Sequence, residues 1–303
     1  MINTERLTKR FGGVTAVEDL TLEIPQGEVF GFLGPNGAGK TTTVRMLASL
    51  IKPSSGTARV NGFKVGSEDK AIRGSVGILT ETPGMYDTLS AERNLQIYAS
   101  LYGVQDVKGQ IEKYLRMLGL WEQRNEPAGT FSKGMKQKLA IARSLLHEPS
   151  TLFLDEPTAS LDPEAARLVR EFILETKKHG RTIFLCTHNL DEADRLCDRI
   201  AVFKTRTLVM DTPANLRARI FGRKVVFHLR QADQGMVSIF QGLPYVQDAQ
   251  VIENKILIQI DEPEEHNPEL IRKLVGAGAD IQFVGELRHS LEDVYFQLVE
   301  ESS

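Results

Sequence analysis

Apolar and polar positions alternate in a regular way over the first two thirds of the chain. Four short runs, at residues 29–33, 76–79, 151–154 and 183–186, are apolar at nearly every position, which is typical of strands buried on both faces. Segments between them, such as residues 44–51, carry apolar side chains at helical spacing. Strands that alternate with helices predict a mainly parallel sheet with helices on its faces.

Two segments depart from this alternation. Residues 2–25 contain two or three strand-like pieces separated by glycine and proline turns, so we expect a small antiparallel β subdomain there. From about residue 88 to residue 147, most apolar side chains recur at helical spacing, which predicts a helical subdomain. Ser132 is the expected N-cap of its last helix.

The pattern starts again near residue 223. The order of segments is then strand, helix, strand, strand, helix, strand, which is the order of a small ferredoxin-like α+β domain, and one more helix follows. We therefore expect two domains, at residues 1–221 and 222–303. Four basic residues near the boundary favour a solvated linker over a binding patch: Arg217, Arg219, Arg223 and Lys224.

Composition limits the classes of protein. The 303 residues are 41% hydrophobic and 25% charged, as in ordinary soluble globular proteins. A net charge of −3 and a pI near 6.1 give no general attraction to nucleic acid or to an anionic membrane. No apolar run is long enough to span a bilayer, and the N-terminal residues lack the core of a signal peptide, so we expect a cytoplasmic protein. Cys186 and Cys197 lack metal-site spacing, which favours buried structural thiols.

A glycine-rich loop follows the first apolar run. Residues 34–41 are GPNGAGKT, and a helical segment follows them. Gly34, Gly37 and Gly39 allow tight turns that direct successive backbone amides toward an anion. Lys40 can place a positive charge on the β- and γ-phosphates of a nucleotide, and the dipole of the helix acts in the same direction. A glycine-rich turn can precede a helix by chance, but this match in a strand–loop–helix context indicates a nucleotide site.

Polar residues directly follow the other apolar runs. Glu81 comes after the second run, Asp155 and Glu156 after the third, and His188 after the fourth. The carboxyl ends of parallel strands meet at one edge of a sheet, so these side chains are expected beside the glycine-rich loop. Asp155 can hold Mg²⁺ together with the Thr41 hydroxyl, and Glu156 is the natural general base for an attacking water. His188 is a candidate sensor of the γ-phosphate, although a lone histidine there is more often an ordinary loop residue.

Phe11 lies in a polar stretch flanked by glycines. An exposed ring at this place could stack on a purine base. It could also cover the edge of a small sheet. The residues by themselves leave both interpretations open.

At this point the sequence resembles a known family, the ATP-binding subunits of ABC transporters. Over residues 1–220 several motifs stand in the family's order: GPNGAGKT, FSKGMKQK, TLFLDEP, ASLD and CTHNLDEAD. The resemblance implies an α/β P-loop ABC-type ATPase domain, with an antiparallel β subdomain and a helical subdomain, that binds ATP and Mg²⁺ and hydrolyses ATP. It also implies that ATP lies between two copies of the chain, arranged head to tail.

The resemblance further implies roles for individual residues. The implied catalytic residues are Lys40, Glu156 and His188. The implied metal ligands are Thr41, Glu81 and Asp155. The implied nucleotide-binding residues, the last three of them at the seam with the opposite copy, are Phe11, Gly34, Pro35, Asn36, Gly37, Ala38, Gly39, Lys40, Thr41, Thr42, Ser132, Gly134 and Asp162.

The chain departs from the family's pattern in two motifs. Glu81 stands where the family commonly has glutamine. The glutamate can still ligate Mg²⁺, but it adds negative charge near the γ-phosphate. FSKGM replaces the common LSGGQ, so that Lys133 and Met135 stand for glycine and glutamine. Because Ser132 and Gly134 are kept, we expect the contact with ATP to survive, whereas the turnover rate is open.

The SKGMKQ variant and the C-terminal extension ending in SLEDVYFQL are similar to ATPase subunits of the multidrug, antibiotic or sodium export group. In that group the membrane part is a separate polypeptide. We therefore expect a second copy and separate transmembrane permease subunits as partners, no nucleic acid, and a peripheral position on the inner face of the cell membrane. ABC ATPases that act on ribosomes or DNA usually carry two cassettes or a long coiled-coil insertion. This sequence has one cassette and no extended heptads, which argues against that class. A regulatory nucleotide-binding protein with weak hydrolysis is the remaining alternative.

Overall fold

The computed structural model divides the chain into two compact units, Met1–Thr212 and Pro213–Ser303. It describes all residues except 81–83, 160, 241, 288 and 302–303. The sequence pattern placed the domain boundary at residue 222, whereas the chain divides before Pro213. None of the helices in the described ranges is long and apolar enough to cross a bilayer.

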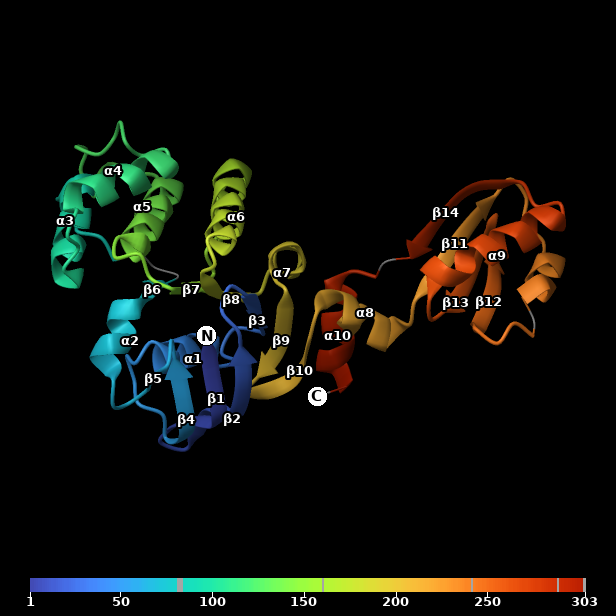
Figure 1. Ribbon diagram of the computed structural model, residues 1–303, viewed down its shortest axis with the longest axis horizontal. Helices are drawn as coiled ribbons and strands as arrows, with labels where there is room; N and C mark the ends of the chain where they lie inside the picture. Colours follow the sequence, from blue (N-terminus) through green and yellow to red (C-terminus); the bar gives the residue numbers. More distant parts are fainter. Residues whose placement is uncertain (81–83, 160, 241, 288, 302–303) are drawn as a thin grey trace. The chain divides into compact units, whose positions relative to one another are not determined.

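A six-stranded sheet forms the centre of the first unit (Figure 1). Its order is β10-β9-β3-β8-β7-β6; all pairs are parallel except β10 with β9. The strands are β3 (Val29–Leu33), β6 (Val76–Leu79), β7 (Thr151–Asp155), β8 (Thr182–Thr187), β9 (Arg199–Lys204) and β10 (Arg206–Asp211). The four apolar runs are strands of this sheet, which confirms the mainly parallel arrangement. The pattern did not predict β9 and β10, and β10 is only half-buried.

A second sheet of the first unit has the order β2-β1-β4-β5 and is antiparallel. Its strands are β1 (Ile2–Phe11), β2 (Val14–Ile24), β4 (Ser55–Val60) and β5 (Phe63–Lys64). Together with helix α1 (Lys40–Leu47) and strands of the central sheet, it encloses one hydrophobic core that includes Leu20, Phe32 and Phe184. This core fixes the N-terminal hairpin against the glycine-rich loop.

Helices α3, α4 and α5 pack together in the first unit (Figure 1), as the helical subdomain was expected to do. The helices and helical turns of this unit, besides α1, are α2 (Asp69–Ser75), α3 (Ala91–Tyr102), α4 (Val107–Met117), η1 (Ala128–Thr130), α5 (Lys133–Leu145), α6 (Pro163–Lys178) and α7 (Leu190–Leu196). Ser132 caps α5 by accepting from the Met135 amide, and Asp162 caps α6 by accepting from the Ala165 amide. Both side chains satisfy amides that lack an intrahelical partner.

The second unit contains a four-stranded antiparallel sheet of order β12-β13-β11-β14 with a hydrophobic core of its own. Its elements are α8 (Pro213–Phe221), β11 (Lys224–Leu229), η2 (Gln234–Phe240), β12 (Val246–Ile252), β13 (Lys255–Ile260), α9 (Pro263–Gly276), β14 (Ile281–Leu287) and α10 (Leu291–Glu301). The expected first helix is a 3-10 helix, η2, and the second is α9, which begins at Pro263.

The interpretation of the basic cluster as a solvated linker was wrong. Arg217 and Arg219 lie on helix α8. Arg223 forms ion pairs with Glu264 at 2.6 Å and with Glu286 at 2.9 Å. The sequence could not reveal these pairs because the carboxylates come from α9 and β14, far along the chain.

Candidate functional site

The glycine-rich loop joins β3 to α1, as the sequence predicted. Lys40, the first residue of α1, is almost completely buried, and its Nζ donates to the carbonyl oxygens of Gly34 at 2.6 Å and Pro35 at 3.3 Å. The N-cap of α1 is Gly39, which has no side chain that could cap the first amides. These amides therefore point into the loop together with the positive end of the helix dipole, an arrangement suited to an anion.

Gly39 is required by its backbone and by its surroundings. Its φ is +106°, outside the range that L-residues ordinarily adopt. A Cβ at this position would lie 2.2 Å from the carbonyl oxygen of Ala16, on strand β2. Gly37 also has a positive φ, +82°, but a Cβ there would meet no atom within 4 Å. The hairpin of the β subdomain thus fixes the loop closely at Gly39 and leaves it open at Gly37.

The polar residues after the parallel strands converge on this loop. The Thr41 hydroxyl donates to Asp155 Oδ2 at 2.7 Å. Glu156 Oε1 lies 3.9 Å from Lys40 Nζ and 2.8 Å from His188 Nδ1. Residues from three separate segments therefore meet at one edge of the sheet, and the predicted convergence is confirmed for these five residues.

The backbone holds Glu156 in an unusual conformation. Its φ is +50°, a left-handed conformation that costs free energy in a non-glycine residue. Its amide donates to the carbonyl oxygen of Cys186 on β8 at 2.9 Å, so the neighbouring strand fixes the turn. Burial raises the pKa of the Cys186 thiol well above its usual value. This thiol stays neutral, as expected of a structural cysteine.

A pocket of about 170 Å³ lies over the loop. Its lining comes from the hairpin, the loop, α1 and the end of β7: Ala16, Pro35, Asn36, Gly37, Gly39, Lys40, Thr41, Thr42, Asp155 and Glu156. Pockets that enclose a whole drug-sized ligand are larger, about 300 to 1,000 Å³. The pocket suits the phosphate end of a nucleotide. The rest of the nucleotide must contact another surface.

The other expected nucleotide-binding residues lie outside this lining. Phe11 ends β1 with half of its side chain exposed, and Lys9 Nζ lies 4.9 Å from the ring centroid. Ser132, Gly134 and Asp162 come together at the starts of α5 and α6, where a Cβ on Gly134 would lie 3.7 Å from Asp162 Oδ2. Glu81, the third expected metal ligand, lies outside the described residues.

Sequence reasoning assigned no role to Thr187 and Glu192. Both side chains are almost fully buried. The Thr187 hydroxyl lies 3.3 Å from Glu156 Oε2 and 3.3 Å from Glu192 Oε2. The only sequence signal is a carboxylate in the first turn of the helix after His188, and charged residues are common at helix starts.

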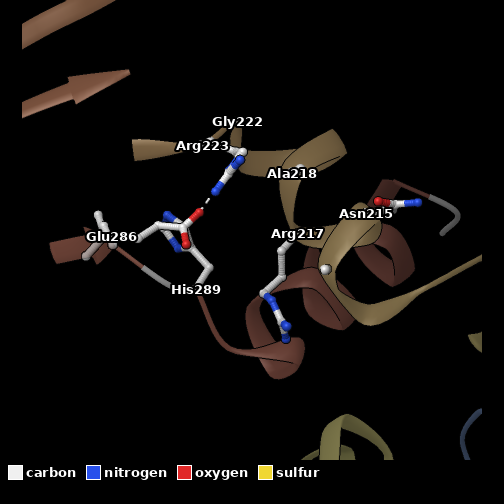
Figure 2. A pocket seen from close by; sticks show the side chains of 9 residues that line it. Asn215, Arg217, Ala218, Gly222, Arg223, Glu286 and His289 are labelled. Atoms are coloured by element: carbon white, nitrogen blue, oxygen red, sulfur yellow. Dashed lines mark hydrogen bonds and ion pairs between the residues drawn. The ribbon is translucent and has the colours of Figure 1, made fainter. Parts of the chain in front are cut away.

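The second unit has a pocket of about 410 Å³ (Figure 2). Arg217 and Arg223 contribute to its lining, together with Glu286 and His289. Figure 2 shows Arg223 joined to Glu286. Because Glu286 and Glu264 already neutralise this guanidinium, the pocket provides less net positive charge than its arginines suggest.

The parallel sheet, the phosphate-binding loop and the converging carboxylates define a P-loop ATPase. The protein family described as ABC transporter matches residues 17–159. The bacitracin transport ATP-binding protein BcrA of Bacillus licheniformis is 35% identical over 300 residues, which are 99% of this chain and 97% of that protein. The Nod factor export ATP-binding protein I of Rhizobium sp. (strain N33) is 33% identical over 300 residues, 98% of this chain and 96% of that protein.

A solved structure, described as the structure of the ATP binding subunit of an ABC transporter, is also similar. Its TM-score is 0.68 at 30% identity, over 73% of this chain and 94% of that one. The chain belongs to the ABC transporter family, among its ATP-binding subunits. It is an ATPase with a P-loop ABC-type fold.

Proposed function

We propose that the chain powers an exporter, as a pair of copies bound to separate transmembrane subunits on the inner face of the cell membrane. The observation that carries the proposal is the convergence of Lys40, Thr41, Asp155, Glu156 and His188 at one edge of the sheet. Transport of bacitracin and export of Nod factors are the activities named for two relatives that match nearly the full chain. Both names support movement of a substrate across a membrane.

The phosphate end of ATP binds in the pocket over the glycine-rich loop. Lys40 and the first amides of α1 supply positive charge to it. The side chains of Thr41 and Asp155 are hard oxygen donors only 2.7 Å apart, which suits Mg²⁺. These two residues, with Glu81 as an expected third ligand, hold Mg²⁺, which neutralises charge on the phosphates when bound.

Glu156 acts as general base and takes a proton from the attacking water. Its Oε1 faces Lys40 and His188, so a proton acceptor lies beside the groups that contact the γ-phosphate. The His188 side chain is largely exposed and can contact the γ-phosphate directly. Positioned donors around a transferring phosphoryl group lower the barrier mainly by electrostatic stabilisation.

Two copies complete the site. The pocket of one copy is small and open, and Ser132, Gly134 and Asp162 do not line it. In a head-to-tail pair, the N-terminus of α5, with the Ser132 hydroxyl and the Gly134 amide, faces the phosphates bound by the opposite copy. Asp162 lies at the seam, and the exposed Phe11 stacks on adenine.

The chain consists of an ATPase domain followed by a ferredoxin-like accessory domain. Support for the ferredoxin-like class comes from the strand order β12-β13-β11-β14 with all neighbours antiparallel. A separate hydrophobic core supports independent folding of this part. The compactness of the two units Met1–Thr212 and Pro213–Ser303 supports a boundary near Pro213, which keeps α8 with the accessory domain.

Steady-state ATP hydrolysis tests the proposal. The full chain is compared with Glu156→Gln, alone and with membranes that contain the transmembrane subunits. We expect Glu156→Gln to lose about 100-fold or more in turnover, to keep ATP binding, and to form dimers that depend on ATP. Glu171→Gln is the matched control, because Glu171 lies on the exposed face of α6, paired with Arg167.

Three outcomes would contradict the proposal. Wild-type turnover in Glu156→Gln would remove Glu156 as the base. Tight ATP binding with negligible turnover by the wild-type chain, with and without membranes, would favour a regulatory nucleotide-binding protein. Sedimentation that finds the same dimer fraction with and without ATP would exclude the ATP-dependent pair.

A further inference from the structure

A buried carboxyl group lies behind the proposed catalytic base. Glu192, in the first turn of α7, is 2% exposed. Asn189 caps this helix by accepting from the Glu192 amide at 3.0 Å. The cap fixes the backbone of Glu192, so its side chain has a defined direction toward the end of β8.

Thr187 connects this carboxyl to Glu156. Its Oγ1 lies 3.3 Å from Oε2 of Glu192 and 3.3 Å from Oε2 of Glu156. The same oxygen accepts a hydrogen bond from the Asn189 amide at 3.0 Å. One hydroxyl group therefore joins the buried carboxyl of Glu192 to the largely buried carboxyl of Glu156, and a backbone donor already uses one of its lone pairs.

The number of protons determines which hydrogen bonds Glu192, Thr187 and Glu156 can form with one another. A threonine hydroxyl has one proton to donate. If both carboxyls are ionised, Thr187 can donate to only one of them, and the other faces a like charge without that hydrogen bond. If Glu192 is protonated, it donates to Thr187, and Thr187 donates to Glu156. In this second arrangement the Glu192 proton and the Thr187 proton each have one acceptor, and the two carboxyls do not compete for the Thr187 hydroxyl.

The surroundings of Glu192 favour its neutral form. Burial is the largest influence and raises the pKa of Glu192. The nearby charge of Glu156 acts in the same direction, whereas Thr158, Thr187 and Arg170 on α6 lower the pKa. Oε1 of Glu192 makes no hydrogen bond of ordinary geometry with the described residues, although Thr158 lies close enough to affect the pKa. Cys197, behind the same helix, stays a neutral thiol because burial raises its pKa.

We propose that Glu192 is a positioning residue for ATP hydrolysis: it donates to the Thr187 hydroxyl and thereby orients that hydroxyl toward Glu156. The inference rests on the proposed role of Glu156 as general base. Thr187 holds Oε2 of Glu156, which leaves Oε1 directed at Lys40 and His188. The plane of the catalytic carboxylate is thus fixed from behind, and the oxygen that takes the proton lies beside Lys40, which lines the phosphate pocket.

Four full-length variants test the inference: Glu192→Gln, Glu192→Ala, Thr187→Val and Thr182→Val. Glutamine keeps an N–H donor for Thr187, so Glu192→Gln should retain kcat within about twofold. Glu192→Ala and Thr187→Val should each lower kcat about tenfold, as expected for loss of one orienting hydrogen bond. The KM for ATP should stay unchanged, because neither residue lines the phosphate pocket.

Thr182→Val is the matched control for Thr187→Val. Thr182 is the first residue of the same strand, is fully buried, and accepts the Gly27 amide at the opposite end of β8. A loss of stability without a loss of kcat is expected there. Thermal melting of every variant separates unfolding from an effect on turnover, and Glu192→Gln remains informative if Glu192→Ala does not fold.

The pH profile of kcat gives a second readout. Above its pKa, Glu192 is ionised and competes with Glu156 for the Thr187 proton, so kcat of the wild type should fall as pH rises through that pKa. Glu192→Gln cannot ionise and should lack this decline. Identical profiles, or wild-type kcat in both Glu192→Ala and Thr187→Val while Glu156→Gln is inactive, would overturn the inference alone. Wild-type turnover in Glu156→Gln would instead refute the proposed function.

Discussion

Gly39 offers a sharp test of how the ATP site is built. Its φ of +106° opposes any larger residue, and so does the carbonyl oxygen of Ala16, which would lie 2.2 Å from an added Cβ. Gly37, two residues earlier, shares the positive φ but has open space around the added carbon. Gly39→Ala and Gly37→Ala therefore separate backbone strain from a steric clash within one loop.

The expected losses of stability and of ATP affinity follow from the backbone strain and the steric clash. A left-handed conformation costs an L-residue about 1–2 kcal/mol, so Gly37→Ala should lower stability by about that amount. Gly39→Ala carries the same cost and also requires the loop and β2 to separate by about 1 Å to reach ordinary contact distance. Because a displacement of about 1 Å can cost about 100-fold in a positioned site, Gly39→Ala should weaken ATP binding by one to two orders of magnitude. Gly37→Ala should weaken it by less than about tenfold.

The assay is titration with a fluorescent ATP analogue, together with thermal melting of each full-length variant. We expect a lower melting temperature in both variants, and the larger loss of affinity in Gly39→Ala. Wild-type affinity in Gly39→Ala would refute the argument, because it would mean that the close approach of Ala16 does not set the shape of the loop.

Three further predictions concern other parts of the chain. Phe11→Ala should weaken ATP binding about tenfold through loss of stacking, whereas Val14→Ala, at a still more exposed position, should not; equal affinities would leave Phe11 as a sheet-edge residue. Ser132→Ala should lower stability by about 1 kcal/mol in denaturant titrations, because it removes the N-cap of α5; no change would mean that water replaces the cap. Arg223 lowers the pKa of Glu264 to about 2, so the stabilising effect of the pair is complete above the ordinary pKa of 4.5 and is lost as pH falls toward 2. The difference in melting temperature between wild type and Arg223→Ala should therefore shrink on acidification. A difference that stays constant with pH would contradict this linkage.

Local sequence patterns were informative where one segment carries a complete signal. The loop at residues 34–41 contains its glycines, its lysine and its threonine in consecutive positions, and a strand and a helix flank it in the structure. Strands β3, β6, β7 and β8 were predicted because burial on both faces demands apolar residues at nearly every position, whereas β9, which pairs in parallel with β3, was missed. The N-cap Ser132 could be predicted because a cap acts on amides only three residues away.

Patterns failed where distant segments decide the structure. Strand β10 is half-buried along its length, so it lacks the apolar signal of a central strand. The residues at the domain boundary suggested a linker, but Arg223 binds carboxylates that lie 41 and 63 positions further along the chain. No local window contains both members of such a pair.

The glycine-rich loop, the carboxylates, the histidine, and most of the strands and helices that carry them could be predicted from the sequence. Their signals depend on residue type and on short spacings. The arrangement of these groups in space follows from the packing of the folded chain. The left-handed backbone of Glu156, the approach of Ala16 to Gly39, and the link from Glu192 through Thr187 to Glu156 depend on packing between separate strands and helices. Packing of that kind is a property of the folded core and leaves no periodic pattern in the chain.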